Sequence, residues 1–218
     1  MRRKVVDTAD GSRTIYLEDW NESYHSKHGA IQEAYHVFIK NGLSLFVSGT
    51  VSILEMGFGT GLNALITLIE GRMGNLNISY TGIEAYPVAP QELKALDYGK
   101  QWDSGIQAFF DRMHTGPWEK EIVVSSHFTL CKKQIDFREV EAVGQYDLIY
   151  FDAFGARVQP ELWTEAIFTQ MYQALKKNGV LVTYSAKGSV RRAMQTVGFQ
   201  VERLPGPPGK REMLRGRK

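Results

Sequence analysis

The sequence is poor in cysteine, in long apolar runs and in net charge, and each shortage argues against a class of protein. Cys131 is the only cysteine among 218 residues, so no disulfide forms within the chain and a reducing cytoplasm is expected. No run approaches the roughly 18 consecutive apolar residues of a membrane-spanning helix. The net charge of +2 is too small to indicate nucleic-acid binding by itself. The composition therefore favours a globular protein of the cytoplasm.

A metal centre is not expected either. His25 and His28 have only two residues between them, but no further cluster of ligand-type side chains accompanies them. The other histidines are scattered, and Cys131 is typical of a small strand residue rather than a nucleophile. Any chemistry must therefore come from other residues.

From about residue 50 onward, short apolar runs alternate with helical patterns. Strands are predicted over 51–56, 78–84, 122–130, 146–154 and 179–186, and helices over 62–73, 90–99, 101–113 and 163–179. Thr164 is a plausible start of the last helix and Gly179 its stop. Strands that are apolar along their whole length indicate a mostly parallel sheet covered on both faces. Residues 51–218 are therefore predicted to form one doubly wound, Rossmann-like α/β domain.

The two ends of the chain do not follow this alternation. Residues 1–50 are predicted to form an N-terminal extension packed on the core, with a short hairpin over 8–19 and a helix over 30–43. Residues 198–216 contain two strand-like pieces separated by proline and glycine. They predict an antiparallel hairpin at the edge of the sheet.

The stretch "EMGFGTGLN" joins the first strand of the domain to its first helix. Gly57, Gly59 and Gly61 are not a P-loop, because no Gly-Lys-Ser/Thr follows. A dinucleotide fingerprint would need a glycine where Leu62 stands. Glu55, two residues before the first glycine, would repel a pyrophosphate but suits a ligand with an ammonium group. S-adenosylmethionine is such a ligand, so the pattern favours a class I methyltransferase.

Further acids follow the other strands. Glu84 ends the second strand, where an acid accepts hydrogen bonds from ribose hydroxyls; dinucleotide enzymes place an acid there too. Asp136 is placed either to bind an adenine amino group or to cap a short helix. Asp152 ends the fourth strand, at the same edge of the sheet, and is suited to accept a proton from an amine nucleophile. Asp147 begins that strand and is expected at the opposite edge.

Basic residues gather near the C-terminus. The tail over 210–218 carries five basic residues against one glutamate, and the segment "KGSVRR" adds three more. Such a cluster is typical either of a solvated, frayed tail or of a surface that binds phosphates.

Four motifs in order resemble one known family. They are Glu55–Asn63, Asp152–Phe154 with Pro160–Trp163, Val190–Arg192, and Lys210–Leu214. Together they are similar to the methyltransferase part of the bifunctional tRNA-modifying enzymes that make 5-methylaminomethyl-2-thiouridine. The resemblance covers most of the chain and extends weakly to its N-terminal segment.

The resemblance implies methylation of the aminomethyl group on the wobble uridine of tRNA, with S-adenosylmethionine as the methyl donor. It implies that the cofactor is held by Glu55, Gly57, Phe58, Gly59, Gly61, Asn63, Glu84 and Asp136. Asp152 would handle the substrate amine, and Phe154 would either stack on the flipped base or only pack at the rim. Tyr24 and Glu33 would help to close the site. The residues that would contact tRNA are Lys187, Arg191, Arg192, Lys210 and Arg211.

The chain also departs from that family. It stops at Lys218, without the flavin-dependent oxidase half, so it resembles a standalone form for which no flavin is expected and a separate enzyme makes the aminomethyl group. Gly155 and Ala156 replace the Ala-Pro of the long forms. Three alternatives stay open: a methyltransferase of a small-molecule or protein amine, a polyamine (aminopropyl) synthase, and a binding module without activity.

Overall fold

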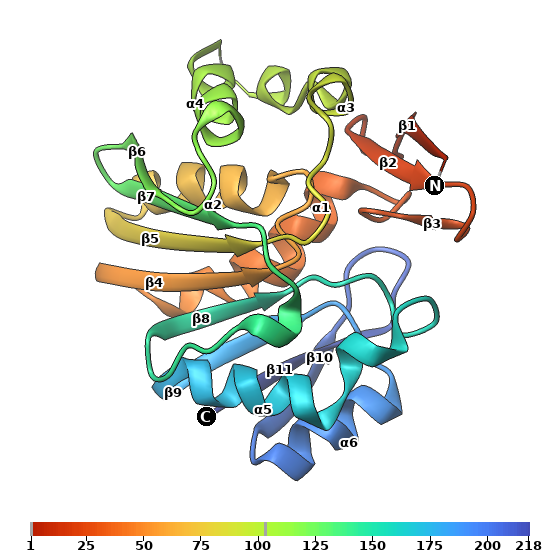
Figure 1. Cartoon of the computed structure of the whole chain (residues 1–218), viewed down its shortest axis with the longest axis vertical. Coiled ribbons are helices and arrows are strands. Elements are labelled where there is room, and N and C mark those ends of the chain that lie inside the picture. The colour runs from red at the N-terminus through yellow and green to blue at the C-terminus, as the bar shows by residue number, and fades with distance from the viewer. Residues whose placement is uncertain (1, 103) are drawn as a thin grey trace.

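An eight-stranded mixed sheet forms the centre of the computed structural model, which describes residues 2–102 and 104–218 (Figure 1). Its strands, in spatial order, are β10 (Gln200–Pro205), β11 (Glu212–Arg217), β9 (Leu175–Thr183), β8 (Tyr146–Phe151), β4 (Gly49–Met56), β5 (Leu76–Ile83), β7 (Phe128–Lys133) and β6 (Glu121–Ser125). The five strands from β9 to β7 run parallel, whereas β10, β11 and β6 pair antiparallel at the two edges.

Helices cover both faces of this sheet. The helices are α1 (Ala30–Ala34), which continues as a π-helix over Tyr35–Lys40, α2 (Leu62–Met73), α3 (Pro90–Leu96), α4 (Ser104–Thr115), α5 (Glu165–Ala174) and α6 (Gly188–Val197). Successive residues of β4 belong to two different hydrophobic cores, one on each face of the sheet. Ile53 packs in the core that includes residues of α1, α2 and α4, and Leu54 packs in the core that includes residues of α5 and α6. Because every strand in the middle is buried on both sides, its apolar run is continuous. The predicted doubly wound α/β class is confirmed.

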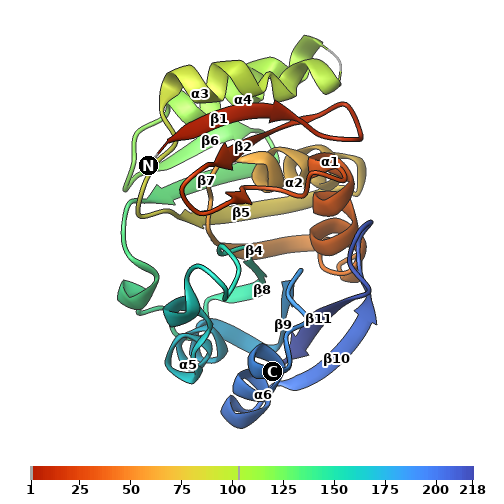
Figure 2. The same cartoon turned by 90° about the vertical axis from the view of Figure 1, so that its right-hand side faces the viewer.

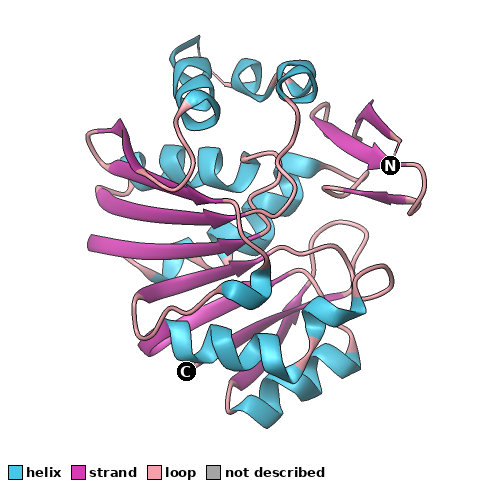
Figure 3. Cartoon of the chain, viewed as in Figure 1, coloured by secondary structure: helices cyan, strands magenta, loops and turns pink. Residues whose placement is uncertain are grey.

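The direction in which the chain winds reverses between β4 and β8. From β4 the chain proceeds outward through β5 to β7, and it then returns to β8 on the other side of β4 and continues to β9. In open α/β sheets a ligand binds outside the carboxyl ends of the strands at such a reversal. In Figure 3 the loops that leave these strand ends lie on the side that faces the N-terminal sheet.

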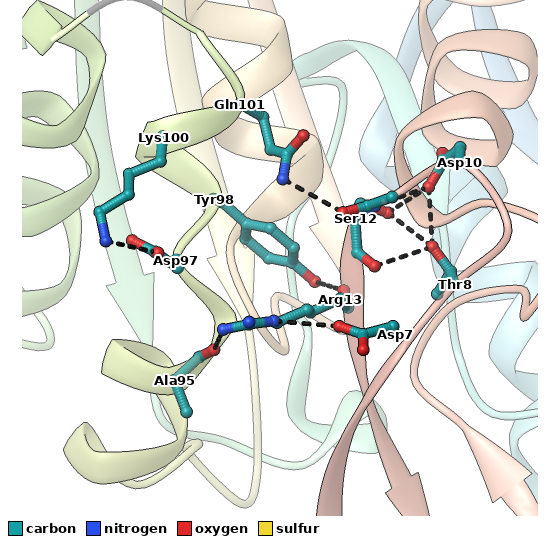
Figure 4. A network of polar contacts seen from close by, with 11 residues as sticks. Asp7, Thr8, Asp10, Ser12, Arg13, Ala95, Asp97, Tyr98, Lys100 and Gln101 are labelled. Atoms are coloured by element: carbon teal, nitrogen blue, oxygen red, sulfur yellow. Dashed lines mark hydrogen bonds and ion pairs between the residues drawn. The ribbon is translucent and has the colours of Figure 1, made fainter.

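The N-terminal segment forms a separate three-stranded antiparallel sheet of β1 (Arg3–Asp7), β2 (Arg13–Leu17) and β3 (Glu22–Ser23). In Figure 1 it lies to the right of the carboxyl ends of the central strands, and in Figure 2, which looks at that side, it lies toward the viewer. Polar contacts attach it to α3 and to the segment that follows α3 (Figure 4). The hydroxyl of the buried Tyr98 donates to the Arg13 carbonyl at 2.8 Å, and the Arg13 guanidinium donates to the Ala95 carbonyl at 2.9 Å.

Two predicted elements were wrong. Residues 122–130 form the hairpin of β6 and β7 rather than one strand, because the polar segment around His127 reverses the chain. The helix predicted over 163–179 begins after Thr164, whose hydroxyl accepts from the Ile167 amide, but it ends at Ala174. Leu175 instead pairs with Tyr146 in the sheet and is fully buried there, so tertiary burial overrides its helix propensity.

The C-terminal hairpin is confirmed, and the idea of a frayed tail is wrong. Strand β11 pairs with β10 on one side and with β9 on the other, so most of the basic tail belongs to the sheet. Among the described residues, no helix has the length and apolar content needed to cross a bilayer.

Candidate active site

A cavity of about 960 Å³ opens at the carboxyl ends of β4, β5 and β8, beneath the N-terminal sheet. It is lined by the glycine loop, by the ends of these strands, by residues 20–27 and by part of the loop between β10 and β11. Ten of the predicted site residues line it: Tyr24, Glu33, Gly57, Phe58, Gly59, Glu84, Asp136, Asp152, Phe154 and Lys210. The structure thus brings together residues that are almost 190 positions apart in the chain.

The glycine loop is held by the two strands that flank β4. The amides of Gly57 and Phe58 both donate to the carbonyl of Ile83, at 3.0 and 2.9 Å. Gly57 has a φ of +97°, and a Cβ on it would lie 2.6 Å from the carbonyl oxygen of Asp152. Only glycine therefore allows the ends of β4 and β8 to approach this closely.

Glu84 lies at the end of β5 with its carboxylate beside the glycine loop. One of its oxygens accepts from the Gly59 amide at 3.0 Å and the other from the Tyr86 amide at 2.9 Å. Burial raises the pKa of Glu84, and these backbone hydrogen bonds oppose that rise. A carboxylate has about four lone-pair sites, so each oxygen retains capacity for a hydroxyl donor.

Glu55 lies behind the cavity wall rather than in it. It is fully buried, and it accepts from Asn63 Nδ2 at 2.8 Å and from the Tyr80 hydroxyl at 2.9 Å. The same Asn63 nitrogen also donates to Asp152 Oδ2 at 2.8 Å. Burial raises the pKa of Glu55 well above its ordinary value. Glu55 therefore acts on the cavity through Asn63.

Asp152 is the carboxylate best suited to proton transfer. Burial first, and then the negative charge of Glu33, raise its pKa to about 7, while the hydrogen bond from Asn63 and the charge of Lys210 oppose this rise. A base works best when its pKa lies close to the working pH. With a pKa of about 7, Asp152 has both its protonated and its ionised form populated near neutrality.

Residues of the N-terminal segment form the roof over this cavity. The rings of Tyr24 and Trp20 both make edge-to-face contacts with Phe154, with centroids 4.9 and 5.5 Å away. His25 Nε2 is 2.8 Å from the hydroxyl of Thr60 in the glycine loop. Burial lowers the pKa of His25 to about 4, so the ring is neutral at physiological pH.

Sequence reasoning missed Tyr184, Trp20 and His25. Tyr184 follows β9 and lines the cavity, and the rule that identified Asp152 at its strand end would also have found it. No comparable signal marks Trp20 or His25, because both reach the cavity through the fold of the N-terminal segment.

Comparisons with known proteins agree with this geometry. Residues 118–218 match a family model described as S-adenosyl-L-methionine-dependent methyltransferase. A solved structure of MnmC2 from Aquifex aeolicus superposes with a TM-score of 0.74 at 25% identity, covering 99% of this chain and 70% of that one. The family match lies in the C-terminal part of the chain, whereas the superposition with MnmC2 extends over nearly all of it.

Curated relatives of this chain are bifunctional proteins named for tRNA 5-methylaminomethyl-2-thiouridine biosynthesis, MnmC. The protein of Chromobacterium violaceum is 28% identical over 90% of this chain, and that of Leptospira interrogans is 30% identical over 93%. The chain spans about a third of the length of these relatives (32% and 33%). A spermidine synthase structure with a TM-score of 0.61 and 14% identity, covering all of this chain and 68% of that one, shares the fold alone.

Two features of the cavity fit S-adenosylmethionine. At Gly57 and Gly59 the loop presents only backbone to the cavity, and a Cβ on Gly59 would meet the Tyr24 ring at 3.1 Å. Beside it, Glu84 offers the acceptor that ribose hydroxyls require.

Of the other predicted site residues, Asp136 is bound to a neighbouring arginine and the rest lie outside the cavity lining. Asp136 caps the short helix Phe137–Glu139, and both its oxygens accept from Arg138, at 2.7 and 2.8 Å. The residues that do not line the cavity are Glu55, Gly61, Asn63, Lys187, Arg191, Arg192 and Arg211. Across residues 2–102 and 104–218, no three His, Cys, Asp or Glu side chains gather as metal ligands would.

Proposed function

We propose that this methyltransferase methylates the aminomethyl group of the modified wobble uridine of tRNA. The observation that carries the proposal is Asp152, a buried carboxylate whose pKa is raised to about 7 in the cofactor cavity of a chain whose relatives are named for 5-methylaminomethyl-2-thiouridine biosynthesis. An acid of this kind serves a nucleophile that must lose a proton before it reacts, as an amine does.

The chemistry then divides between the bound donor and the chain. When bound, S-adenosylmethionine supplies a methyl carbon that is electrophilic because it is attached to a sulfonium. Asp152 accepts a proton from the substrate ammonium, which frees the nitrogen lone pair to form the new bond to carbon while the carbon–sulfur bond breaks. Asp152 afterwards releases its proton to solvent. No flavin takes part in this step, because moving a methyl group from sulfur to nitrogen is not a redox reaction.

The other cavity residues would bind and orient. In this proposal Glu84 accepts from the ribose hydroxyls, Asp136 lies toward the adenine, and Glu55 orients Asn63 and, through it, Asp152. Phe154, held between Trp20 and Tyr24, offers an aromatic surface to the uridine. Stacking of a base on such a ring contributes roughly 1–3 kcal/mol.

The tRNA itself would contact four cations outside the cavity: Lys187, Arg191, Arg192 and Arg211. Three lie on or just before α6, and the fourth lies in the loop between β10 and β11. Lys210 is not in this group, because its ammonium points into the cavity. We further propose that a separate enzyme of the cytoplasm makes the aminomethyl group before the tRNA reaches this site.

A direct test is an assay with purified protein, S-adenosylmethionine and tRNA that carries aminomethyl uridine, followed by mass spectrometry of the nucleosides. We expect one methyl group on the aminomethyl nitrogen, and none on the same tRNA with unmodified uridine. Decarboxylated S-adenosylmethionine with a small diamine tests the aminopropyl alternative. Aminopropyl transfer, or methylation of free amines in place of the tRNA, would overturn the proposal.

A further inference from the structure

The ammonium of Lys210 occupies a position in the cavity that its place in the sequence did not suggest. It donates to Glu33 Oε1 at 2.5 Å and lies 3.8 Å from the centre of the Tyr184 ring. A carboxylate together with the face of an aromatic ring is a favourable environment for any ammonium group. Lys210 thus marks a place in the cavity that binds a cation.

The partners of Lys210 are fixed by other contacts. Glu33 is only 7% exposed, and its second oxygen accepts from the Ser26 amide at 2.8 Å. The Tyr184 hydroxyl donates to the carbonyl of Ala153 at 2.8 Å, which holds the ring beside Asp152. The two groups that surround the ammonium therefore keep their places without it.

The loop that carries Lys210 is held by backbone hydrogen bonds that do not involve its side chain. The loop between β10 and β11 is closed by the Gly206 amide bonded to the Arg211 carbonyl and by the Lys210 amide bonded to the Pro207 carbonyl. The Lys210 side chain, about one-third exposed, extends from this loop into the cavity on a flexible four-carbon stem. It can leave Glu33 by rotating its own bonds, without a movement of the loop.

The charges around this position do not balance when Asp152 is ionised. Glu33 and Asp152 then contribute two negative charges to one wall of the cavity, and Lys210 contributes one positive charge. His25, which interacts with Glu33 and Lys210 from the N-terminal segment, has its pKa lowered by burial and is neutral at physiological pH. The wall therefore favours one additional cation.

We propose that Glu33, the Tyr184 ring and Asp152 form a subsite for a primary ammonium group, which Lys210 occupies in the free protein and from which the substrate's ammonium displaces it. Lys210 then acts as an internal competitor that compensates the buried charge of Glu33 until a cationic substrate arrives. A neutral ligand of the same shape gains nothing from the exchange. In naming the substrate amine as the displacing cation, this inference rests on the proposed function.

Two matched pairs of probes separate charge from shape. The first pair is the nucleosides 5-aminomethyluridine and 5-hydroxymethyluridine, and the second is benzylamine and benzyl alcohol. Each is titrated by NMR into the full chain in the presence of S-adenosylhomocysteine, which occupies the cofactor site without allowing turnover.

Lys210→Met removes the competing ammonium and keeps the length of the side chain. We expect it to tighten binding of the amines by roughly five- to ten-fold, the range of one partly exposed charged hydrogen bond. Binding of the alcohols should change less than about two-fold. A merely structural ion pair predicts equal changes for amine and alcohol, or none, and either result would overturn the inference.

Glu33→Gln tests the same subsite from the other side and keeps an oxygen that accepts from Ser26. The amines should bind roughly ten-fold more weakly, while the alcohols and S-adenosylhomocysteine bind as before. Amine binding equal to that of wild type would overturn the inference even if Lys210→Met does not fold. A response of benzylamine without binding of the uridine would uphold the subsite and count against the tRNA substrate. Methylation of tRNA by a protein that binds the amines no better than the alcohols would uphold the tRNA substrate and overturn the subsite.

Discussion

Asp152 follows β8 and Glu84 follows β5, the two strands that flank β4, but their carboxylates have different partners. Glu84 accepts two backbone amides, which stabilise its charge, whereas Asp152 accepts one bond from Asn63 and faces the negative charge of Glu33. Hydrogen bonds favour the charged form of an acid, and a like charge disfavours it. Glu84 is therefore suited to binding and Asp152 to proton transfer.

The raised pKa of Asp152 makes a prediction about stability. Its pKa is 3.8 in an unperturbed chain and about 7 in the fold, so the folded state binds more protons between these values and loses stability as the pH rises through this window. Asp152→Asn cannot ionise and should raise the stability by about 1–3 kcal/mol above pH 7, an advantage that disappears near pH 4.

Thermal unfolding against pH measures this difference, and Asp147→Asn on the same strand is the control. Asp147 pairs with Lys176 at 2.7 Å and accepts from the Ser52 amide, so its substitution should lower the stability instead. If Asp152→Asn is less stable than wild type above pH 7, ionisation of the buried Asp152 does not destabilise the fold, and the prediction is wrong.

Glu84 carries a prediction about the cofactor. Glu84→Ala should weaken binding of S-adenosylmethionine by about 1.5–3 kcal/mol, the usual range for hydrogen bonds to a charged group. Glu84→Gln keeps an acceptor for the Gly59 amide, so its affinity for S-adenosylmethionine should fall less than that of Glu84→Ala. Calorimetry with both variants, and with NAD as a ligand that should not bind, checks the site. An unchanged affinity in Glu84→Ala would move the ribose site elsewhere.

The sequence located these two acids because each stands at the end of an apolar strand, and parallel strands place such ends at one edge. It did not place Lys210 inside the cavity, because the loop that carries Lys210 to Glu33 follows a path that depends on the whole hairpin. Nor did it show that Glu55 lies behind the wall, because burial depends on Asn63 and Tyr80 from two other elements.

At the scale of elements, the N-terminal sheet completes the site by covering it. One of the polar contacts that attach it is the bond from the Tyr98 hydroxyl to the Arg13 carbonyl. Tyr98→Phe keeps the ring and removes this bond, which should lower stability by about 0.5–1.5 kcal/mol. Hydrogen exchange should become faster in β1 and β2, and the cofactor should bind more weakly.

Tyr16→Phe is the matched control for this variant. The Tyr16 hydroxyl also donates a hydrogen bond, to Asn21 at 2.7 Å, but on an exposed surface within the same segment. It should leave both exchange and cofactor affinity unchanged. Equal effects of the two variants would show that the bond from Tyr98 does not hold the N-terminal sheet in place.

The elements that were predicted correctly are those whose burial and local signals agree. Helix α2 has the predicted bounds, since Gly61 precedes it and its apolar residues are buried along its length. The predicted strand 122–130 failed because only the tertiary fold decides whether a polar turn breaks an apolar run. The end of α5 was misplaced because Leu175 is recruited into the sheet.

At the scale of the whole molecule, tRNA binding is predicted to depend on the cations near α6. If Lys187, Arg191, Arg192 and Arg211 contact phosphates, neutralising two of them should flatten the dependence of log affinity on log salt by about 1.4–1.8 units. Neutralising the exposed Lys120 and the half-buried Lys133, which lie by the two strands at the opposite side of the sheet, should not flatten this dependence. An unchanged slope in the first variant would show that these cations are only solvated.

Turnover of tRNA that carries aminomethyl uridine, followed against pH for wild type and Asp152→Asn, tests the central claim most directly. For wild type we expect the rate to rise as Asp152 ionises around pH 7. Asp152→Asn should be slower by a factor on the order of 10²–10⁴, with cofactor affinity nearly unchanged. Raising the pH should partly restore its rate, because solution then supplies the free amine. Turnover by Asp152→Asn equal to wild type across this range would contradict the account.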